Sequence, residues 1–148
     1  MAVWRKGAEG VPKVWRLVHA GRFGRRSPLA SAGVRRPRNE LPASGIYHVT
    51  TRGVARAATF RVVDDFRLFL RLLAQEVERH DWRVHTFCLM PNHHHLVLET
   101  ELWRLSEGMR RLNGVYAQAF NRRHRRWGHL FGERFASWVV ESEEHLAA

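Results

Sequence analysis

A pair of adjacent strand-like segments is the feature that most constrains the fold of this chain. Residues 83–90 (RVHTFCLM) and 93–99 (HHHLVLE) are rich in β-branched, aromatic and aliphatic side chains, and only Pro91 and Asn92 separate them. Two strands joined by so short a break are expected to pair as an antiparallel hairpin. The fold must therefore accommodate this hairpin.

Further periodic segments lie on both sides of the hairpin. Residues 45–53 gather β-branched and aromatic side chains between two glycines and predict a strand, as do residues 135–140. Apolar residues recur every three or four positions over about 64–80, with an aspartate as the cap, and over about 106–121, which predicts two helices. The order strand, helix, strand, strand, helix, strand predicts an α+β fold of the ferredoxin-like split βαββαβ type. In that fold an antiparallel sheet carries its helices on one face.

The two ends of the sequence differ from this periodic middle. Residues 1–42 contain clusters of Gly, Pro, Ser and Arg without a sustained period, so we predict a disordered basic arm, followed by one domain over 43–148. Such an arm could tether DNA or could result from an upstream start codon. Residues 142–144 form a good helix start, but the sequence stops at Ala148, so we expect a domain that lacks its last helix.

The charge balance favours a polyanionic partner. Lys and Arg number 25 against 14 Asp and Glu, for a formal net charge of +11, and nearly all the basic residues are Arg. The planar guanidinium group matches phosphate oxygens and stacks on bases, which favours nucleic acid. The single cysteine, Cys88, excludes an intramolecular disulfide, and no apolar run is long enough to span a membrane. We therefore expect a cytoplasmic protein without a membrane partner.

Three consecutive histidines begin the second strand of the hairpin. Residues two apart in a strand point to the same face, so His93 and His95 project together and His94 projects to the opposite side. Two neighbouring imidazoles can chelate one divalent cation, and imidazole ligands alone would favour zinc or manganese. The alternative is a polar strand face with satisfied histidines, and the spacing alone does not decide between the two.

The surrounding residues add a family resemblance. Residues 89–99 resemble the histidine-hydrophobic-histidine strand of the HUH single-tyrosine transposases, which are IS200-like, and in particular the branch associated with repetitive extragenic palindromes. His94 departs from that pattern, because the family usually has an apolar or aromatic residue there. Three other segments are similar to the family's opening strand, second helix with its exit, and Gly-His-Leu-Phe segment: 45–53, 112–124 and 128–135. The resemblance covers about residues 37–148.

The resemblance implies DNA transposition through cleavage and rejoining of single-stranded DNA, with a phosphotyrosine intermediate. It also implies that His93 and His95 hold Mg²⁺ or Mn²⁺, which polarises the scissile phosphate. In the family the nucleophilic tyrosine lies on the helix after the last strand, a position that would fall beyond Ala148. We assign no catalytic role to Tyr47 or to Tyr116, which belongs to an apolar helical stripe. The chain as given is therefore expected to be an inactive fragment.

The predicted DNA contacts are basic residues and one tryptophan. Guanidinium groups hold phosphates while an indole ring stacks on an unpaired base, so the expected partner is single-stranded or hairpin DNA. The alternative is a solvated helix end, where cations also favour the helix dipole. The resemblance also allows a homodimer. The predicted DNA-binding residues are Arg52, Arg122, Arg123, Arg125, Arg126 and Trp127.

Two other functions stay open from the sequence. The first is a non-catalytic DNA-binding remnant or co-opted regulator that keeps the basic surface and the histidine pair. The second is a zinc-stabilised nucleic-acid-binding domain that uses Cys88 with His93 and His95, which we rank last because no spaced Cys/His quartet is present.

Overall fold

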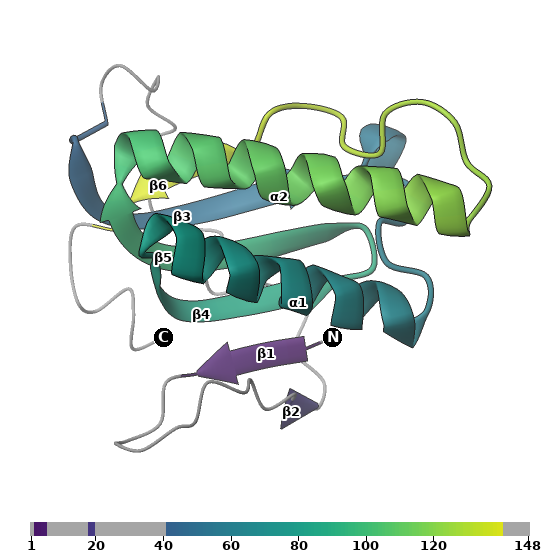
Figure 1. Ribbon diagram of the computed structural model, residues 1–148, viewed down its shortest axis with the longest axis horizontal. Helices are drawn as coiled ribbons and strands as arrows, with labels where there is room; N and C mark the ends of the chain where they lie inside the picture. The colour runs from purple at the N-terminus through teal and green to yellow at the C-terminus, as the bar shows by residue number, and fades with distance from the viewer. Residues whose placement is uncertain (1, 6–17, 20–40, 141–148) are drawn as a thin grey trace.

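A computed structural model describes residues 2–5, 18–19 and 41–140 (Figure 1). Within these residues the sheet has the strand order β2-β1-β4-β5-β3-β6, with every neighbouring pair antiparallel. Both long helices cover the same face of the sheet (Figure 1). The predicted α+β fold of the βαββαβ type is confirmed. The elements are β1 Ala2–Arg5, β2 Val18–His19, β3 Ser44–Arg52, the short 3-10 helix η3 Val54–Arg56, α1 Val63–His80, β4 Arg83–Met90, β5 His93–Glu101, α2 Leu102–Arg123 and β6 Ala136–Val139.

The predicted hairpin lies at the centre of this sheet. β4 and β5 pair antiparallel, with Met90 opposite His93 across the two-residue turn. On its other side β5 pairs with β3 along the full length of both, from Ser44 opposite Glu101 to Arg52 opposite His93. The three histidines therefore lie at the start of a strand that is hydrogen-bonded on both sides, and such a strand is held rigidly.

Two short strands extend the sheet beyond β4. β1 pairs with β4 from Ala2 opposite Leu89 to Arg5 opposite Thr86, and β2 pairs with β1. The sequence predicted no strand in this region. Residues 6–17 and 20–40 lie outside the described residues, so the disordered basic arm stays a prediction, as does the helix start at 142–144, which also lies outside them.

The start of α1 agrees with the predicted aspartate cap, whereas the start of α2 differs from the prediction. An aspartate does stabilise the start of α1, but it is Asp65 inside the first turn, whose carboxylate accepts hydrogen bonds from the backbone N–H groups of Arg61 and Val62. α2 begins at Leu102, four residues before the predicted start. No capping side chain marks this point; instead the Leu102 N–H donates to the carbonyl of Ala43 at 2.8 Å, a tertiary contact that local sequence does not reveal.

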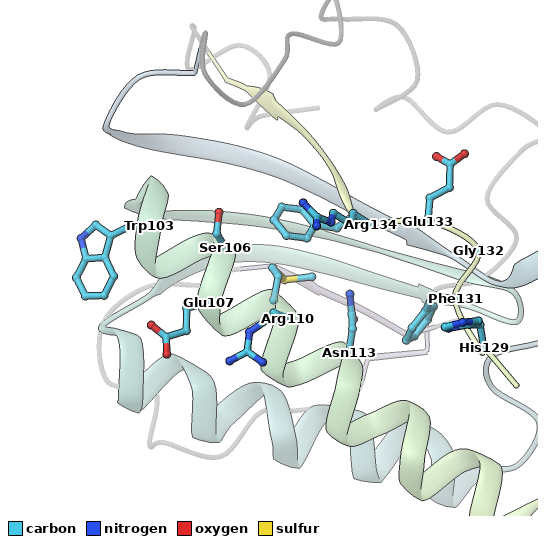
Figure 2. A pocket seen from close by; sticks show the side chains of 12 residues that line it. Trp103, Ser106, Glu107, Arg110, Asn113, His129, Phe131, Gly132, Glu133 and Arg134 are labelled. Carbon is cyan, nitrogen blue, oxygen red and sulfur yellow. The ribbon is translucent and has the colours of Figure 1, made fainter.

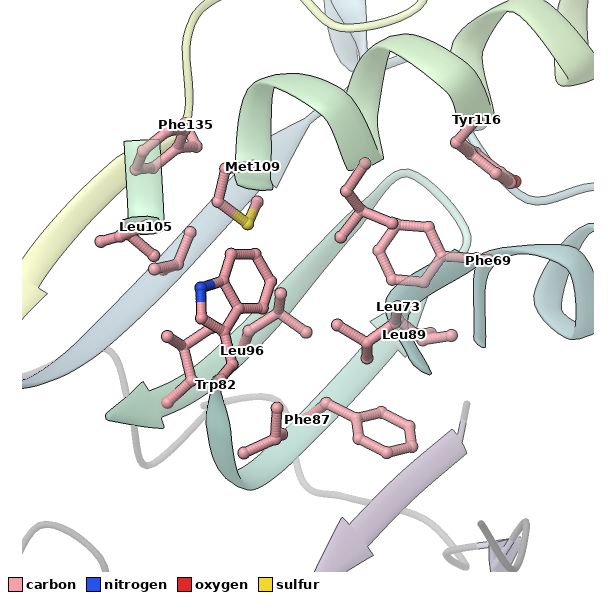
Figure 3. Packing of buried hydrophobic residues seen from close by; sticks show 14 of the residues in the cluster. Phe69, Leu73, Trp82, Phe87, Leu89, Leu96, Leu105, Met109, Tyr116 and Phe135 are labelled. Atoms are coloured by element: carbon pink, nitrogen blue, oxygen red, sulfur yellow. The ribbon is translucent and has the colours of Figure 1, made fainter. Parts of the chain in front are cut away.

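The hydrophobic core lies between the helices and the sheet (Figure 3). Phe69 and Leu73 of α1 and Met109 of α2 pack on Leu89 and Leu96 of the hairpin, and all five are fully buried. Each such side chain contributes roughly 1.5–3 kcal/mol when it is removed from water, so this layer fixes the position of β5. No helix in the described residues is long and apolar enough to cross a membrane.

Candidate metal and DNA-binding site

The strand alternation sorts the three histidines of β5 between the two faces of the sheet. His94 is fully buried on the helix face, together with Leu96 and Leu98. His93 and His95 lie on the opposite face, which we call the far face, and both are partly exposed. Their ring centroids are 5.0 Å apart. This separation brings two imidazoles close enough to ligate one cation.

His94 behaves as a core residue. Its ring lies 4.6 Å from that of Phe69 and 5.8 Å from that of Phe131, and neither ring nitrogen has a hydrogen-bond partner among the described residues. Burial, and then the neighbouring His95 and His93, lower the pKa of His94 to about 3, so its imidazole is neutral. It therefore takes the place of the apolar residue that the family pattern has at this position, and it does not face the far-face pair.

The turn before β5 orients His93. Its Nδ1 lies 2.7 Å from Oδ1 of Asn92, while Nδ2 of Asn92 donates to the carbonyl oxygen of Arg56 at 3.3 Å. The backbone of the turn is held from the other side, because the carbonyl of Asn92 accepts from the N–H of Gly53 at 2.9 Å. Only glycine fits at position 53, where a Cβ would lie 2.2 Å from the carbonyl oxygen of Ala57.

His95 is oriented by a residue on the neighbouring strand. Nε2 of His48 in β3 lies 2.9 Å from Nδ1 of His95, and the two rings stack with centroids 5.1 Å apart. His48 points to the far face because Tyr47 and Val49, on either side of it, are fully buried in the core. Trp138 of β6 covers the other side of the His48 ring, with centroids 5.4 Å apart.

The electrostatics keep these far-face imidazoles neutral. Burial lowers the pKa of His48 below its ordinary value. Burial and then the positive charge of Arg52 lower that of His93. For His95, burial acts first and the neighbouring His48, His93 and Arg52 add to it, and the pKa falls to about 3. A neutral imidazole has a lone pair to donate, which is the form that binds a metal.

The pair can hold a cation with open coordination positions. Each Nδ1 is engaged by Asn92 or His48, and no hydrogen bond to Nε2 of His93 or His95 is found among the described residues. A cation bound by two imidazoles keeps positions for water and phosphate oxygens, which Mg²⁺ and Mn²⁺ prefer. With oxygen ligands in the open positions the donor set is compatible with Mn²⁺, one of the two cations that the resemblance implies, while imidazole ligands by themselves favour softer cations than Mg²⁺.

A zinc site gains no support from the geometry. Cys88 lies opposite His95 on β4, and burial raises the pKa of its thiol, so a cation would have to deprotonate a neutral thiol to bind it. No group of three or more His, Cys, Asp or Glu side chains arranged to hold a metal is found in the described part of the chain.

The two tyrosines of the sequence are both core residues. Tyr47 donates its hydroxyl to the carbonyl of Pro42, and Tyr116 donates to the carbonyl of Thr59, each at 2.6 Å. Both side chains are fully buried, and burial raises the pKa of both hydroxyls. A nucleophilic tyrosine must reach a phosphate beside the metal, and neither of these is placed to do so.

The predicted DNA-binding residues do not form one cluster. Arg52 ends β3 directly opposite His93, beside the far-face histidine pair. Arg123 is engaged elsewhere, because its guanidinium group donates to the buried carboxylate of Asp65 at 2.7 Å. Arg126 donates to the side chain of Asn121 and to the carbonyl of His129, and so shapes its own loop. The DNA contacts of all three stay predictions.

The end of α2 and the turn after it carry four exposed residues of the predicted set, Arg122, Arg123, Arg125 and Trp127. Arg122 and Arg125 are exposed, and Trp127 has 93% of its surface accessible, the largest value among the exposed large hydrophobic side chains. An indole ring so exposed contributes little to the hydrophobic core. A positive φ of 49° at Arg125 marks the sharp change of direction that places this turn.

A separate groove runs between α2 and the segment that leads to β6 (Figure 2). Its volume is about 940 Å³, and Trp103, Arg110 and Arg134 are among the residues that line it. Glu107 and Glu133 also line it and balance the two arginines in formal charge. None of the predicted metal-binding or DNA-binding residues lines this groove.

The comparison with protein families decides the identity. The family described as "Transposase IS200 like" matches residues 43–147. The chain belongs to this family. A crystal structure of a protein from Deinococcus radiodurans R1, assigned as a transposase, is similar in fold with a TM-score of 0.54. That similarity covers 73% of this chain and 88% of the other at 14% sequence identity, and at this identity it supports the fold alone. No curated protein is significantly similar to the chain.

Sequence reasoning missed two residues beside the family's histidine pair. Asn92 was interpreted only as part of a break between strands, although its position directly before His93 is a usable signal. His48 is 47 residues away from His95. Only the register of β3 against β5 brings the two together, so the sequence alone carried no comparable signal for His48.

Proposed function

We propose that this chain supplies the metal-binding and DNA-binding part of an IS200-like transposase that cleaves and rejoins single-stranded DNA. The supporting observation is the pair of neutral imidazoles on the far face, His93 and His95, with both Nδ1 atoms hydrogen-bonded and both Nε2 atoms left for a cation. When bound, Mg²⁺ or Mn²⁺ would neutralise charge that develops on the phosphate oxygens. The resemblance of residues 45–53 and 89–99 supports the branch associated with repetitive extragenic palindromes.

The protein's own groups would position the DNA. Arg52, opposite His93, is placed to hold a phosphate next to the scissile one. Arg122 and Arg125 would contact the backbone further along, and Trp127 would stack on an unpaired base. This division favours single-stranded or hairpin DNA, whose unpaired bases are accessible, and we expect the protein to meet this DNA in the cytoplasm.

The tyrosine nucleophile of the family mechanism is considered separately from the metal and DNA contacts. Because Tyr47 and Tyr116 are the only tyrosines in the sequence and both are buried, these 148 residues hold no tyrosine placed for attack. We therefore propose that the chain as given binds metal and DNA without forming a phosphotyrosine link by itself.

The test is incubation of the purified chain with an end-labelled hairpin oligonucleotide and Mn²⁺. We expect binding that weakens steeply with salt and no covalent adduct on a denaturing gel. An adduct that disappears in Tyr47→Phe or Tyr116→Phe would show that a buried tyrosine reaches the phosphate. Equal affinity for the hairpin and for a fully paired duplex would contradict the preference for unpaired bases.

The DNA surface can be tested with a matched pair of tryptophans. Trp127→Ala removes the proposed stacking platform and is expected to weaken hairpin binding by about tenfold or more, measured by fluorescence anisotropy. Trp103→Ala is the control, because this indole is also exposed, at 59%, but lines the groove beside α2. Loss of binding in Trp103→Ala alone would move the DNA site to that groove.

A further inference from the structure

We propose that His48 and Asn92 are positioning residues that hold both metal-binding imidazoles in one tautomer, with the proton on Nδ1 and the lone pair on Nε2. The inference rests on the proposed metal site and adds to it a reason why the pair is competent before a cation arrives. Each residue contacts one histidine of the pair: Asn92 contacts His93, and His48 contacts His95.

The hydrogen bonds around Asn92 determine the tautomer of His93. The carbonyl oxygen of Arg56 can only accept, so the side-chain atom of Asn92 beside it must be the amide nitrogen. The other end of the same amide is then the oxygen, which can only accept from Nδ1 of His93, 2.7 Å away. Nδ1 of His93 therefore carries the proton, and Nε2 is left with a lone pair.

The contact between His48 and His95 allows two arrangements, of which one is compatible with a metal. If Nδ1 of His95 accepted, the proton of this neutral ring would be on Nε2, and that nitrogen could not ligate a cation. If Nδ1 of His95 donates to Nε2 of His48, Nε2 of His95 is free to bind. Ligating histidines commonly donate their second ring N–H to such an acceptor.

The surroundings of His48 make it a rigid acceptor. Its backbone lies between β5 and β6, opposite Val97 on one side and Trp138 on the other. His48 is 8% exposed; its ring stacks on that of His95 and contacts the ring of Trp138 at a tilted angle. The two acceptors thus come from different parts of the fold, a strand for His48 and a tight turn for Asn92, and they converge on one histidine pair.

The first measurement needs no metal. Long-range ¹H–¹⁵N correlation spectra of the metal-free protein report which ring nitrogen of each histidine is protonated. We expect Nδ1–H for both His93 and His95, and Nδ1–H for His48. An Nε2–H tautomer at His95 in the wild-type protein would overturn the proposal for His48, whether or not the protein binds metal.

The second measurement is a calorimetric titration with Mn²⁺ alone on the full chain. His48→Leu removes the acceptor and is expected to weaken Mn²⁺ binding by about ten- to a hundredfold, the usual effect of removing such a partner. His48→Gln restores an acceptor oxygen and should recover most of the affinity. At His93, Asn92→Leu removes the acceptor and should weaken Mn²⁺ binding in the same way. Asn92→Asp keeps an acceptor oxygen and should recover most of the affinity. The control is His85→Leu, because this histidine on β4 contacts Glu99.

The outcomes distinguish the positioning role of His48 and Asn92 from the proposed metal site. Unchanged Mn²⁺ affinity in folded His48→Leu overturns the positioning role while the proposed function stands. Both expected tautomers in a wild-type protein that binds no Mn²⁺ support the positioning geometry and contradict the proposed metal site. Thermal melting identifies any variant that fails to fold, and in that case His48→Gln and the wild-type spectra decide.

Discussion

Histidine side chains have opposite environments on the two faces of β5. His94 packs among aromatic rings on the helix face with both ring nitrogens unpaired, whereas His93 and His95 on the far face each have a partner for Nδ1. The difference arises only from the alternation of a strand, since the three residues are consecutive. In this strand, the face of the sheet on which a histidine lies therefore determines whether it packs in the core or has a hydrogen-bond partner for Nδ1.

The side chains on the two faces of β5 also differ in whether they contribute to stability or to the proposed function. Side chains on the helix face form the core, and their replacement changes the free energy of unfolding. The pair on the far face contributes little to that core and carries the proposed chemistry. Substitutions on the two faces should therefore have separable effects, which the following predictions test.

The largest effect is expected from the far-face pair. The double variant His93→Ala/His95→Ala removes both imidazole ligands, so Mn²⁺ binding should fall by about a hundredfold or more. The melting temperature should change little, because both side chains are partly exposed. Calorimetric titration and thermal melting measure the two quantities. A variant that kept its Mn²⁺ affinity would place the metal elsewhere in the protein.

The next effect is expected within the helix layer, at Asp65. Its fully buried carboxylate accepts from Arg123 and His124 and caps the start of α1, so Asp65→Ala should destabilise the fold by about 3 kcal/mol or more. Chemical denaturation measures this loss. Asp64→Ala is the control, because Asp64 is exposed and, in the part of the chain that the structure describes, its ion pair is with exposed Arg67. Similar losses in both variants would contradict a special role for the buried carboxylate.

The same carboxylate gives a pH dependence. Burial by itself raises the pKa of Asp65, but the N–H groups of Arg61 and Val62 and the side chains of Arg123 and His124 outweigh it, and the pKa lies below its ordinary value. The stabilisation is therefore complete above the unfolded pKa, about 4, and is lost as the pH falls through the lower folded value. Asp65→Asn should show a flatter decline of stability below pH 4.

The smallest effect is expected at His94, and it has the opposite sign. His94→Leu removes two unpaired ring nitrogens from the core, so the fold should gain about 1 kcal/mol, seen as a higher melting temperature. Mn²⁺ affinity should stay at the wild-type value, because this side chain points away from the far-face pair proposed to bind the cation. Loss of Mn²⁺ binding in a stable His94→Leu protein would mean that the two faces are coupled.

Local patterns account for what could be predicted. The hairpin followed from two apolar segments and a two-residue break, and β4 was predicted with its observed ends. The far-face pairing of His93 and His95 followed from strand periodicity alone. The start of α2 was predicted four residues too late, because its first turn is held by the carbonyl of Ala43, a residue from another part of the chain.

By itself the sequence determined the order strand, helix, strand, strand, helix, strand from β3 to β6, the fold class and the face on which each histidine lies, since these depend on periodicities read over a few residues. It gave no sign of β1 and β2. Only the tertiary structure decided that His48 contacts His95, that Asp65 engages Arg123, and that Trp127 stays exposed. The first two contacts join residues 47 and 58 positions apart. Strand register and helix packing select such partners, because many alternative pairings share the same local pattern.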